Sequence, residues 1–140
     1  MDPGEARSRF LAVPVARLAT ADAECRPHIV PITFALLSEA TLVSAIDHKP
    51  KRTTALRRLA NISANPHVAV LADHYSDDWS TLWWARADGR ARVLAAGEEA
   101  ELRVAAVGAL QRRYPAYRDR RPEGALVVIS VERWSGWSAT

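Results

Sequence analysis

Strand-like segments dominate this chain, and most of them follow one another without a helix between them. Runs rich in β-branched, leucine and aromatic residues lie at 15–20, 28–37, 41–46, 67–73, 81–95 and 125–138. Residues of these types fit the pleated surface of a sheet. Strands outnumber helices and do not alternate with them, which disfavours a parallel α/β sheet. The pattern predicts a mainly β fold, an antiparallel barrel with flanking helices.

Two of these segments contain residues that interrupt regular strand pairing. Pro31 lies inside 28–37, and a proline in a sheet is confined to an edge strand or a bulge. Asp88 and Gly89 lie inside 81–95, where the pair could form a tight hairpin turn. Gly89 could instead mark a bulge in one long strand. The local sequence leaves both alternatives open.

Helical spacing of apolar residues appears in three places. It predicts a short helix over 5–12, a second helix from a cap at Thr53 to the Asn-Pro break near 65, and a third over 97–114. Residues 115–124 are expected to form a loop.

The bulk properties describe an ordinary soluble globule. A length of 140 residues fits a single domain spanning 1–140. No apolar run approaches the ~20 residues of a membrane span, and the N-terminus lacks the apolar stretch of a signal peptide. The single Cys25 cannot form an internal disulfide, which is typical of a reducing compartment. We therefore expect a cytoplasmic protein without a membrane partner.

The distribution of lysine singles out one segment. The chain has 17 Arg but only two Lys, and both lysines lie in "DHKPKRTTALRR" at 47–58. The first turn of a helix offers free N–H groups and the positive end of its dipole, which suits a phosphate or carboxylate. Four side chains that can carry positive charge directly precede the expected start of the helix: His48, Lys49, Lys51 and Arg52.

Two other interpretations of the basic segment remain. It could be an exposed loop that binds nothing, since charged runs are commonly solvated. A nucleic-acid site is disfavoured, because one short basic run lacks a recognition fold and interleaved aromatic residues. The net charge of +3 is also too small to argue for nucleic acid.

Several other side chains carry weaker signals. Asp73, His74, Asp77 and Asp78 share one loop, but their spacing matches no standard metal site, so we expect a solvated loop and no metal. Trp79, in the same loop, is a candidate wall of a ligand cleft. The remaining candidates are expected mainly to be structural: Trp83 and Trp84 on opposite faces of a strand, Trp134 and Trp137 near the C-terminus, Tyr114, Tyr117, His28 and His67.

Three stretches resemble one known family. They are "RPHIVPITFAL", then "DHKPKRTTALRRLANISANPHVAVLADHYSDDWSTLWWARADGRARVL", and the terminal "VERWSGWS". Together they resemble the pyridoxamine-5′-phosphate-oxidase-like split β-barrel proteins, most closely the actinobacterial branch of probable F420-dependent enzymes. The resemblance extends over about residues 10–138. It implies a six-stranded antiparallel FMN-binding split barrel and a homodimer with cofactor sites between the subunits.

The resemblance also implies where a cofactor would lie. The isoalloxazine-like ring would lie near the second strand, and the phosphate would lie at the end of the third strand and in the loop and helix that follow. The ring positions are Pro31, Ile32 and Thr33. The phosphate positions are Ser44, Ala45, Lys49, Lys51, Arg52 and Thr53, with Arg57 or Arg58 behind them.

The function that follows from the resemblance is hydride transfer from reduced coenzyme F420 to an unknown small organic substrate. No catalytic side chain is named, because the deazaflavin supplies the hydride. Flavin mononucleotide is the alternative cofactor. A non-catalytic carrier of a flavin, heme or deazaflavin is the alternative function.

Overall fold

The computed structural model describes residues 1–46 and 53–140, with side chains from residue 57 onward in the second range. Lys49, Lys51 and Arg52 therefore lie outside the described residues, and so does the side chain of Thr53. Predictions that rest on these four residues remain predictions.

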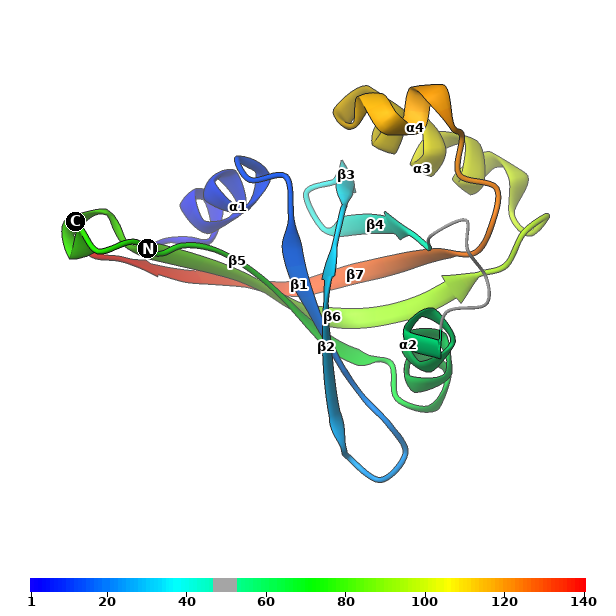
Figure 1. Ribbon diagram of the computed structural model, residues 1–140, viewed down its shortest axis with the longest axis horizontal. Helices are drawn as coiled ribbons and strands as arrows, with labels where there is room; N and C mark the ends of the chain where they lie inside the picture. Colours follow the sequence, from blue (N-terminus) through cyan, green and yellow to red (C-terminus); the bar gives the residue numbers. More distant parts are fainter. Residues whose placement is uncertain (47–52) are drawn as a thin grey trace.

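The described residues form one antiparallel sheet of seven strands in the order β2-β1-β5-β6-β7-β4-β3. The sheet is strongly twisted and does not close (Figure 1). The predicted antiparallel, mainly β fold is confirmed, but the barrel is open and has seven strands rather than six. The strands are β1 (Ala16–Ala21), β2 (Pro27–Ile32), β3 (Ala35–Ser38), β4 (Thr41–Ala45), β5 (His67–His74), β6 (Trp83–Leu94) and β7 (Leu126–Ser138).

The additional strand arises because the expected strand at 28–37 is divided in two. β2 pairs with β1 and β3 pairs with β4, so the two halves lie at opposite edges of the sheet. Thr33 and Phe34 join these edges directly. Pro31 lies in an edge strand, as predicted, where only one neighbouring strand requires hydrogen bonds.

β6 is one continuous strand that pairs with β5 on one side and β7 on the other. The register with β7 shifts between Asp88 and Gly89, so the bulge interpretation is correct and the hairpin turn is wrong. A Cβ atom at Gly89 would lie 2.1 Å from the carbonyl oxygen of Ser130. The close approach of the two backbones therefore requires glycine.

The helices follow the sequence pattern with one exception. They are α1 (Pro3–Leu11), α2 (Thr53–Ala64), α3 (Ala100–Arg113) and α4 (Pro115–Asp119), with a 3₁₀ turn η1 (Trp79–Thr81). The exception is α4, which lies in a segment that was expected to be a loop. Pro115 occupies the first turn of α4, where its fixed φ favours a helix and its missing N–H needs no partner.

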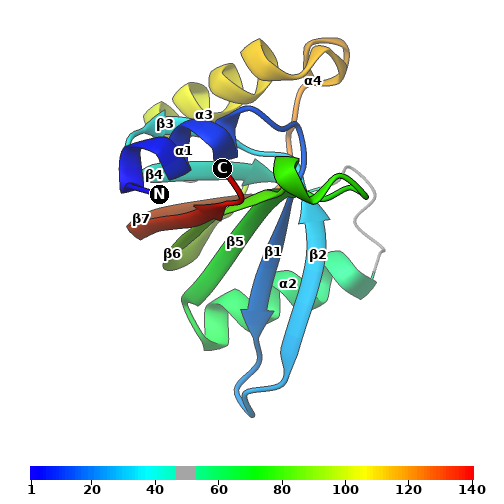
Figure 2. The same cartoon turned by 90° about the vertical axis from the view of Figure 1, so that its left-hand side faces the viewer.

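The α1 and α2 helices cover the same face of the sheet. The ring of Phe10 in α1 packs against Phe34 and Trp134, with centroid distances of 4.8 Å and 5.2 Å. The indole N–H of Trp134 donates to the carbonyl oxygen of Glu39, which fixes the C-terminal strand as predicted. In Figure 2, α2 lies behind β1 and β2, and the side-chain amide of Asn61 donates to the hydroxyl of Thr20.

A second apolar cluster joins α3 to β3, β4 and the start of β7, and includes Val43, Leu110 and Leu126. Over β2, β1, β5 and the start of β6, no helix among the described residues covers the face opposite α1 and α2. We call this surface the outer face, and it carries Ile29, Leu71, Trp84 and Trp137. None of the described helices has the length and apolar character needed to cross a membrane.

Candidate functional site

The predicted ring-binding residues lie at the edge of the sheet, but their side chains face different ways. Pro31 is exposed, whereas Ile32 belongs to the hydrophobic core and is only 5% exposed. Only the backbone of Ile32 is therefore available to a ligand. Thr33 follows β2 directly and is partly buried, at the junction between the two sheet edges.

The junction at Thr33 is held by side chains from two other elements. The hydroxyls of Thr33 and Tyr117 lie 2.7 Å apart, and the hydroxyl of Ser44 donates to the carbonyl oxygen of Thr33 at 2.6 Å. Ser44 is buried, so its side chain is already engaged. Ala45 is buried as well and packs in the cluster under α3. Ser44 therefore holds the junction through this hydrogen bond, and the side chains of both predicted phosphate positions are buried.

The next residue, Phe34, is held by the hydroxyl of Tyr114. This hydroxyl accepts a hydrogen bond from the backbone N–H of Phe34 at 3.0 Å and lies 2.9 Å from the carbonyl oxygens of both Phe34 and Pro14. The guanidinium of Arg113 donates to the same hydroxyl at 3.1 Å and lies over the Phe34 ring. The end of α3 therefore fixes the backbone at the point where the two sheet edges meet.

The arginine pair on α2 divides into one exposed and one half-buried side chain. Arg57, the first of the two predicted positions, is exposed, whereas Arg58 is partly buried. Burial lowers the pKa of the Arg58 guanidinium, and Tyr117 is near enough to act in the opposite direction. The Nε atom of Arg58 is buried without a hydrogen-bond partner, and no carboxylate pairs with this residue among the described residues.

His28 lies on β2 close to both arginines. Burial lowers the pKa of its imidazole, and the nearby charges of Arg57 and Arg58 lower it further. Its Nδ1 atom is buried and has no hydrogen-bond partner. An imidazole with a lowered pKa and a guanidinium whose Nε atom has no hydrogen-bond partner among the described residues therefore lie near one another on β2 and α2.

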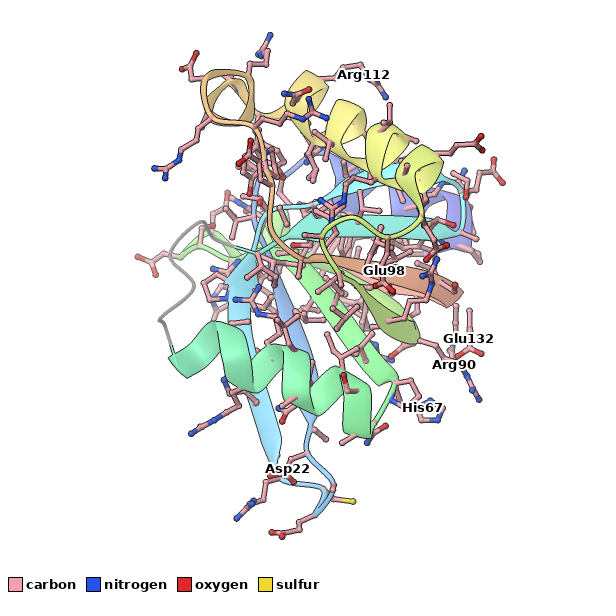
Figure 3. All side chains as sticks on the ribbon, turned by 90° about the vertical axis from the view of Figure 1, so that its right-hand side faces the viewer. Asp22, His67, Arg90, Glu98, Arg112 and Glu132 are labelled. Carbon is pink, nitrogen blue, oxygen red and sulfur yellow. The ribbon has the colours of Figure 1, made fainter. Side chains whose placement is uncertain are left out.

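A cleft of about 520 Å³ opens between α2 and the β1–β2 hairpin. Its floor and sides are mostly polar, and Asp22, labelled at the hairpin in Figure 3, already binds the Arg26 side chain at 2.7 Å. The residues that line it are Asp22, Arg26, Pro27, His28, Arg57 and Asn61. Its volume is in the range of small-molecule sites.

Trp79 is distant from this cleft within one chain. It is 76% exposed in η1, which joins β5 to β6. Because α2 leads into β5 at His67, α2 and η1 lie at opposite ends of that strand (Figure 1). Trp79 therefore does not share a site with Arg57 or Arg58 within a single chain.

The outer face carries its own shallow recess of about 280 Å³, lined by Leu71, Asp73, Tyr75, Trp84 and Arg86. The guanidinium of Arg86 lies over the Trp84 ring and pairs with Asp88 at 2.9 Å. The positions of Trp83 in the core and Trp84 on the outer face confirm that these two residues point in opposite directions.

The structure brings together residues that sequence reasoning treated as peripheral. Tyr117 was expected to pack at a boundary and His28 to be structural or exposed, and Arg58 was only an alternative to Arg57. The helical period places Arg57 and Asn61 on the cleft side of α2 and Arg58 beside the core residue Ile62, and this spacing was available in the sequence. The approach of Tyr117 was not available, because it depends on how α4 folds back.

The side chains at this site can bind and orient a ligand. They supply hydroxyl and guanidinium donors and the free backbone groups of an edge strand. No group among them is arranged as a nucleophile next to a base. The described residues also contain no group of three or more His, Cys, Asp and Glu side chains that could hold a metal.

Comparison with known proteins gives one family and a consistent fold. The family model described as Pyridoxamine 5′-phosphate oxidase matches residues 3–138. No curated protein matches the sequence.

Solved structures with the same fold are distant in sequence. A conserved hypothetical protein from Mycobacterium tuberculosis is 20% identical, with a TM-score of 0.75 over 99% of this chain and 86% of its own. An FAD-binding protein from Mesorhizobium loti is 21% identical, with a TM-score of 0.73 over 97% and 94%. The heme storage protein HutZ from Vibrio cholerae is 17% identical, with a TM-score of 0.67 over 96% and 90%.

Proposed function

This chain belongs to the pyridoxamine 5′-phosphate oxidase family, and from that premise we propose that it is an oxidoreductase that uses coenzyme F420. In this proposal the reduced cofactor transfers a hydride to a small organic substrate. Flavin mononucleotide is the alternative cofactor, supported by the fold that the chain shares with FAD-binding proteins.

The observation that carries the proposal is the half-buried Arg58 near the edge strand β2, because its Nε atom has no hydrogen-bond partner and its guanidinium no carboxylate partner among the described residues. Burying a guanidinium without a counter-charge is unfavourable, so such groups are normally paired. An anionic or strongly accepting group of a flavin-type cofactor would provide that partner. The residues present therefore fit the cofactor that the family implies.

The chain's own residues would then bind the cofactor and exclude water. The edge backbone at Pro31, Ile32 and Thr33 would hold the ring, and Arg57 and Arg58 would hold its anionic parts. We keep Lys49, Lys51, Arg52 and Thr53 as proposed phosphate ligands. The deazaflavin supplies the hydride chemistry when bound, so the protein needs to position and desolvate it.

We further propose that the protein is a homodimer formed through the outer face. Ile29, at 63% exposure, and Trp137, at 43%, belong to an apolar surface that no described helix covers. Large apolar side chains exposed on an uncovered sheet face are typical of an interaction site. In such a dimer Trp79 would reach the cofactor site of the partner subunit, which reconciles its candidate role with its distance from α2.

The other parts of the proposal concern partners and location. We propose a small-molecule substrate, no nucleic-acid or membrane partner, and a cytoplasmic location. The single free cysteine, Cys25, is exposed in a turn, which suits a reducing environment.

A cofactor carrier is the second candidate function. The chain shares its fold with a heme storage protein, and the described site has no arranged acid–base pair. A carrier would bind its ligand without accelerating its reactions.

Turnover separates the two functions. Purified protein loaded with reduced F420 is mixed with a panel of enones, quinones and nitroaromatic acceptors, and cofactor oxidation is followed by absorbance. An enzyme oxidises the cofactor faster than the free cofactor reacts with at least one acceptor. A rate equal to that of the free cofactor across the panel favours the carrier.

A further inference from the structure

The edge of β3 is open on one side. β3 is the last strand of the sheet, and among the described residues it pairs only with β4. An open edge presents backbone N–H and C=O groups that no neighbouring strand bonds, and an extended chain can add to such an edge. The hydrogen bonds of β4 determine which residue of β3 presents these groups.

Leu36 is the residue of β3 whose backbone groups point away from the sheet. Along β4 these groups alternate between its two neighbouring strands. Ala40 accepts a hydrogen bond from β7 at 2.7 Å, and Ile46 donates one at 3.1 Å to the residue before β7. Leu42 has the same orientation as these two and therefore also faces β7. Leu36 lies opposite Leu42, so its N–H and C=O turn to the open edge.

The neighbouring residue with the same orientation shows the contrast. The N–H and C=O of Phe34, two residues earlier, both bond to the hydroxyl of Tyr114. No described side chain or loop bonds the N–H or C=O of Leu36. One donor and one acceptor on the same residue therefore remain available at the edge.

A cleft of about 400 Å³ lies along this edge, within the range of small-ligand sites. Leu36 packs against the core cluster that contains α1, whereas Leu37 packs against the cluster under α3. In Figure 1, β3 lies between these two helices. The cleft is therefore positioned where an added strand would run, between α1 and α3. Its lining residues are Leu11, Ala35, Leu36, Ala109, Arg112 and Arg113.

Two arginines give the cleft its charge, and only one of them is engaged. The guanidinium of Arg113 already donates to the carbonyl oxygen of Val13 and to the hydroxyl of Tyr114. Arg112 is exposed and pairs with no carboxylate among the described residues. No acid is among the described residues that line the cleft. Arg112 can therefore bind a carboxylate that a ligand supplies.

We propose that the open edge of β3 binds a short, extended and acidic peptide segment of a partner protein. One apolar residue of the segment exchanges two backbone hydrogen bonds with Leu36, and a neighbouring carboxylate pairs with Arg112. A simple carboxylic acid would satisfy only the arginine, whereas a peptide also supplies the donor and acceptor that Leu36 needs. The register with β4 shifts after Leu36, which limits the pairing to a short segment. This site is separate from the proposed cofactor site and does not depend on it.

The test is a titration of the whole isotope-labelled protein with the blocked peptide acetyl-Glu-Leu-Leu-Glu-amide. NMR follows the backbone amide of Leu36. We expect a saturable downfield shift of this amide proton, because a free N–H gains a hydrogen bond. The same peptide with both leucines N-methylated keeps its charges and side chains but loses the central N–H donors. We expect it to bind about fivefold more weakly, the effect of one lost hydrogen bond.

Matched changes of charge identify the role of Arg112. Arg112→Gln is expected to weaken binding of the acidic peptide about two- to fivefold, as for an exposed ion pair. Arg118→Gln removes the same charge from an exposed position on α4 that does not line the cleft, and affinity is expected to stay near the wild-type value. The peptide acetyl-Lys-Leu-Leu-Lys-amide is expected to bind more weakly than the acidic peptide, and Arg112→Gln should not weaken it further.

Several results would overturn the proposal. Equal affinity for the N-methylated peptide would show that the backbone of Leu36 is not used. Equal losses in Arg112→Gln and Arg118→Gln would show general attraction to positive charge. A Leu36 shift that depends on protein concentration without peptide would show that a second copy of the chain occupies the edge. Absence of saturable binding would exclude the site, and none of these results bears on cofactor binding.

Discussion

His28 makes the free energy of unfolding depend on pH. Burial and the two neighbouring arginines hold the pKa of its imidazole below the usual value of about 6.5. Between the two pKa values the unfolded chain binds a proton that the folded chain does not, so stability rises with pH across that window. The contribution is complete above pH 6.5 and is lost as the pH falls through the folded-state pKa.

We therefore predict that the free energy of unfolding falls more steeply from pH 7 to pH 5 in the wild type than in His28→Gln. Urea denaturation followed by tryptophan fluorescence gives this slope. His67→Gln, at an exposed position at the start of β5, is the control and should follow the wild type. Equal slopes for wild type and His28→Gln would contradict the assignment.

For individual residues, the sequence predicted which types would occur near the site better than it predicted their roles. The basic character of α2 was visible, but which arginine is desolvated was not settled. Ser44 was expected to contact phosphate, yet its hydroxyl is bound to the carbonyl oxygen of Thr33. Such roles depend on neighbours that are distant in sequence, and residue spacing does not record them.

The bulge between β6 and β7, where Glu132 of β7 is the extra residue opposite Asp88 and Gly89, has the most specific sequence requirement of any element. At Gly89 a Cβ atom would lie 2.1 Å from the carbonyl oxygen of Ser130, which belongs to a paired backbone and cannot move aside cheaply. We predict that Gly89→Ala destabilises the protein by about 1–3 kcal/mol, the typical range for a steric conflict in a packed interior.

Denaturation in urea measures this change, and Gly124→Ala is the matched control. A Cβ atom at Gly124 meets nothing within 4 Å. An equal effect of the two substitutions would mean that the register shift does not depend on glycine.

Most elements were predictable because their signals are local. Strands β1, β4, β5 and β7 and helices α1, α2 and α3 follow hydrophobic periodicity within a few residues. The division of 28–37 was not predictable, since apolar residues continue through Thr33 and Phe34. Only the assignment of β2 and β3 to opposite sheet edges shows why the strand must end there.

At the scale of the whole molecule, positive charge is concentrated in two segments. Residues 47–58 carry five bases and one acid, and so do residues 112–121, which gives each segment a net charge of +4. Since the whole chain has a net charge of +3, the remainder carries −5. The two segments include the first half of α2 and all of α4, and Tyr117 of α4 is near enough to Arg58 of α2 to influence its pKa.

This asymmetry should attract an anionic cofactor. We predict that the affinity for F420 falls about tenfold or more when salt rises from 50 mM to 500 mM, because exposed charges are screened within a Debye length. Riboflavin, which has a comparable ring but no phosphate, is the control and should bind with little salt dependence. Equal salt dependence of both ligands would contradict electrostatic recruitment.

The outer face gives a prediction about assembly. Ile29→Lys places a charge in the proposed dimer interface and should shift the protein from dimer to monomer in analytical ultracentrifugation. Val104→Lys is the control, because Val104 on α3 has the same 63% exposure and lies away from the outer face. A wild-type monomer, or a dimer unaffected by Ile29→Lys, would show that the outer face is not a dimer interface.

The fold of the whole molecule was foreseen more fully than its site. Strand order within the chain and the resemblance to a family predicted an antiparallel split barrel. The number of strands and the open edge depend on the crossing at Thr33 and Phe34, which local sequence does not show. The candidate site combines residues from α2, α4 and the end of β2, which are distant in sequence. It could therefore be recognised only in the folded structure.

The most direct test of the central claim is a titration of the purified protein, in parallel, with oxidised F420 and with flavin mononucleotide. Five tryptophans provide an intrinsic fluorescence signal for binding. We predict saturable binding of one cofactor per chain, with F420 bound more tightly than flavin mononucleotide. Binding of neither cofactor would contradict the proposal that the edge of β2 and the start of α2 form a flavin-type cofactor site.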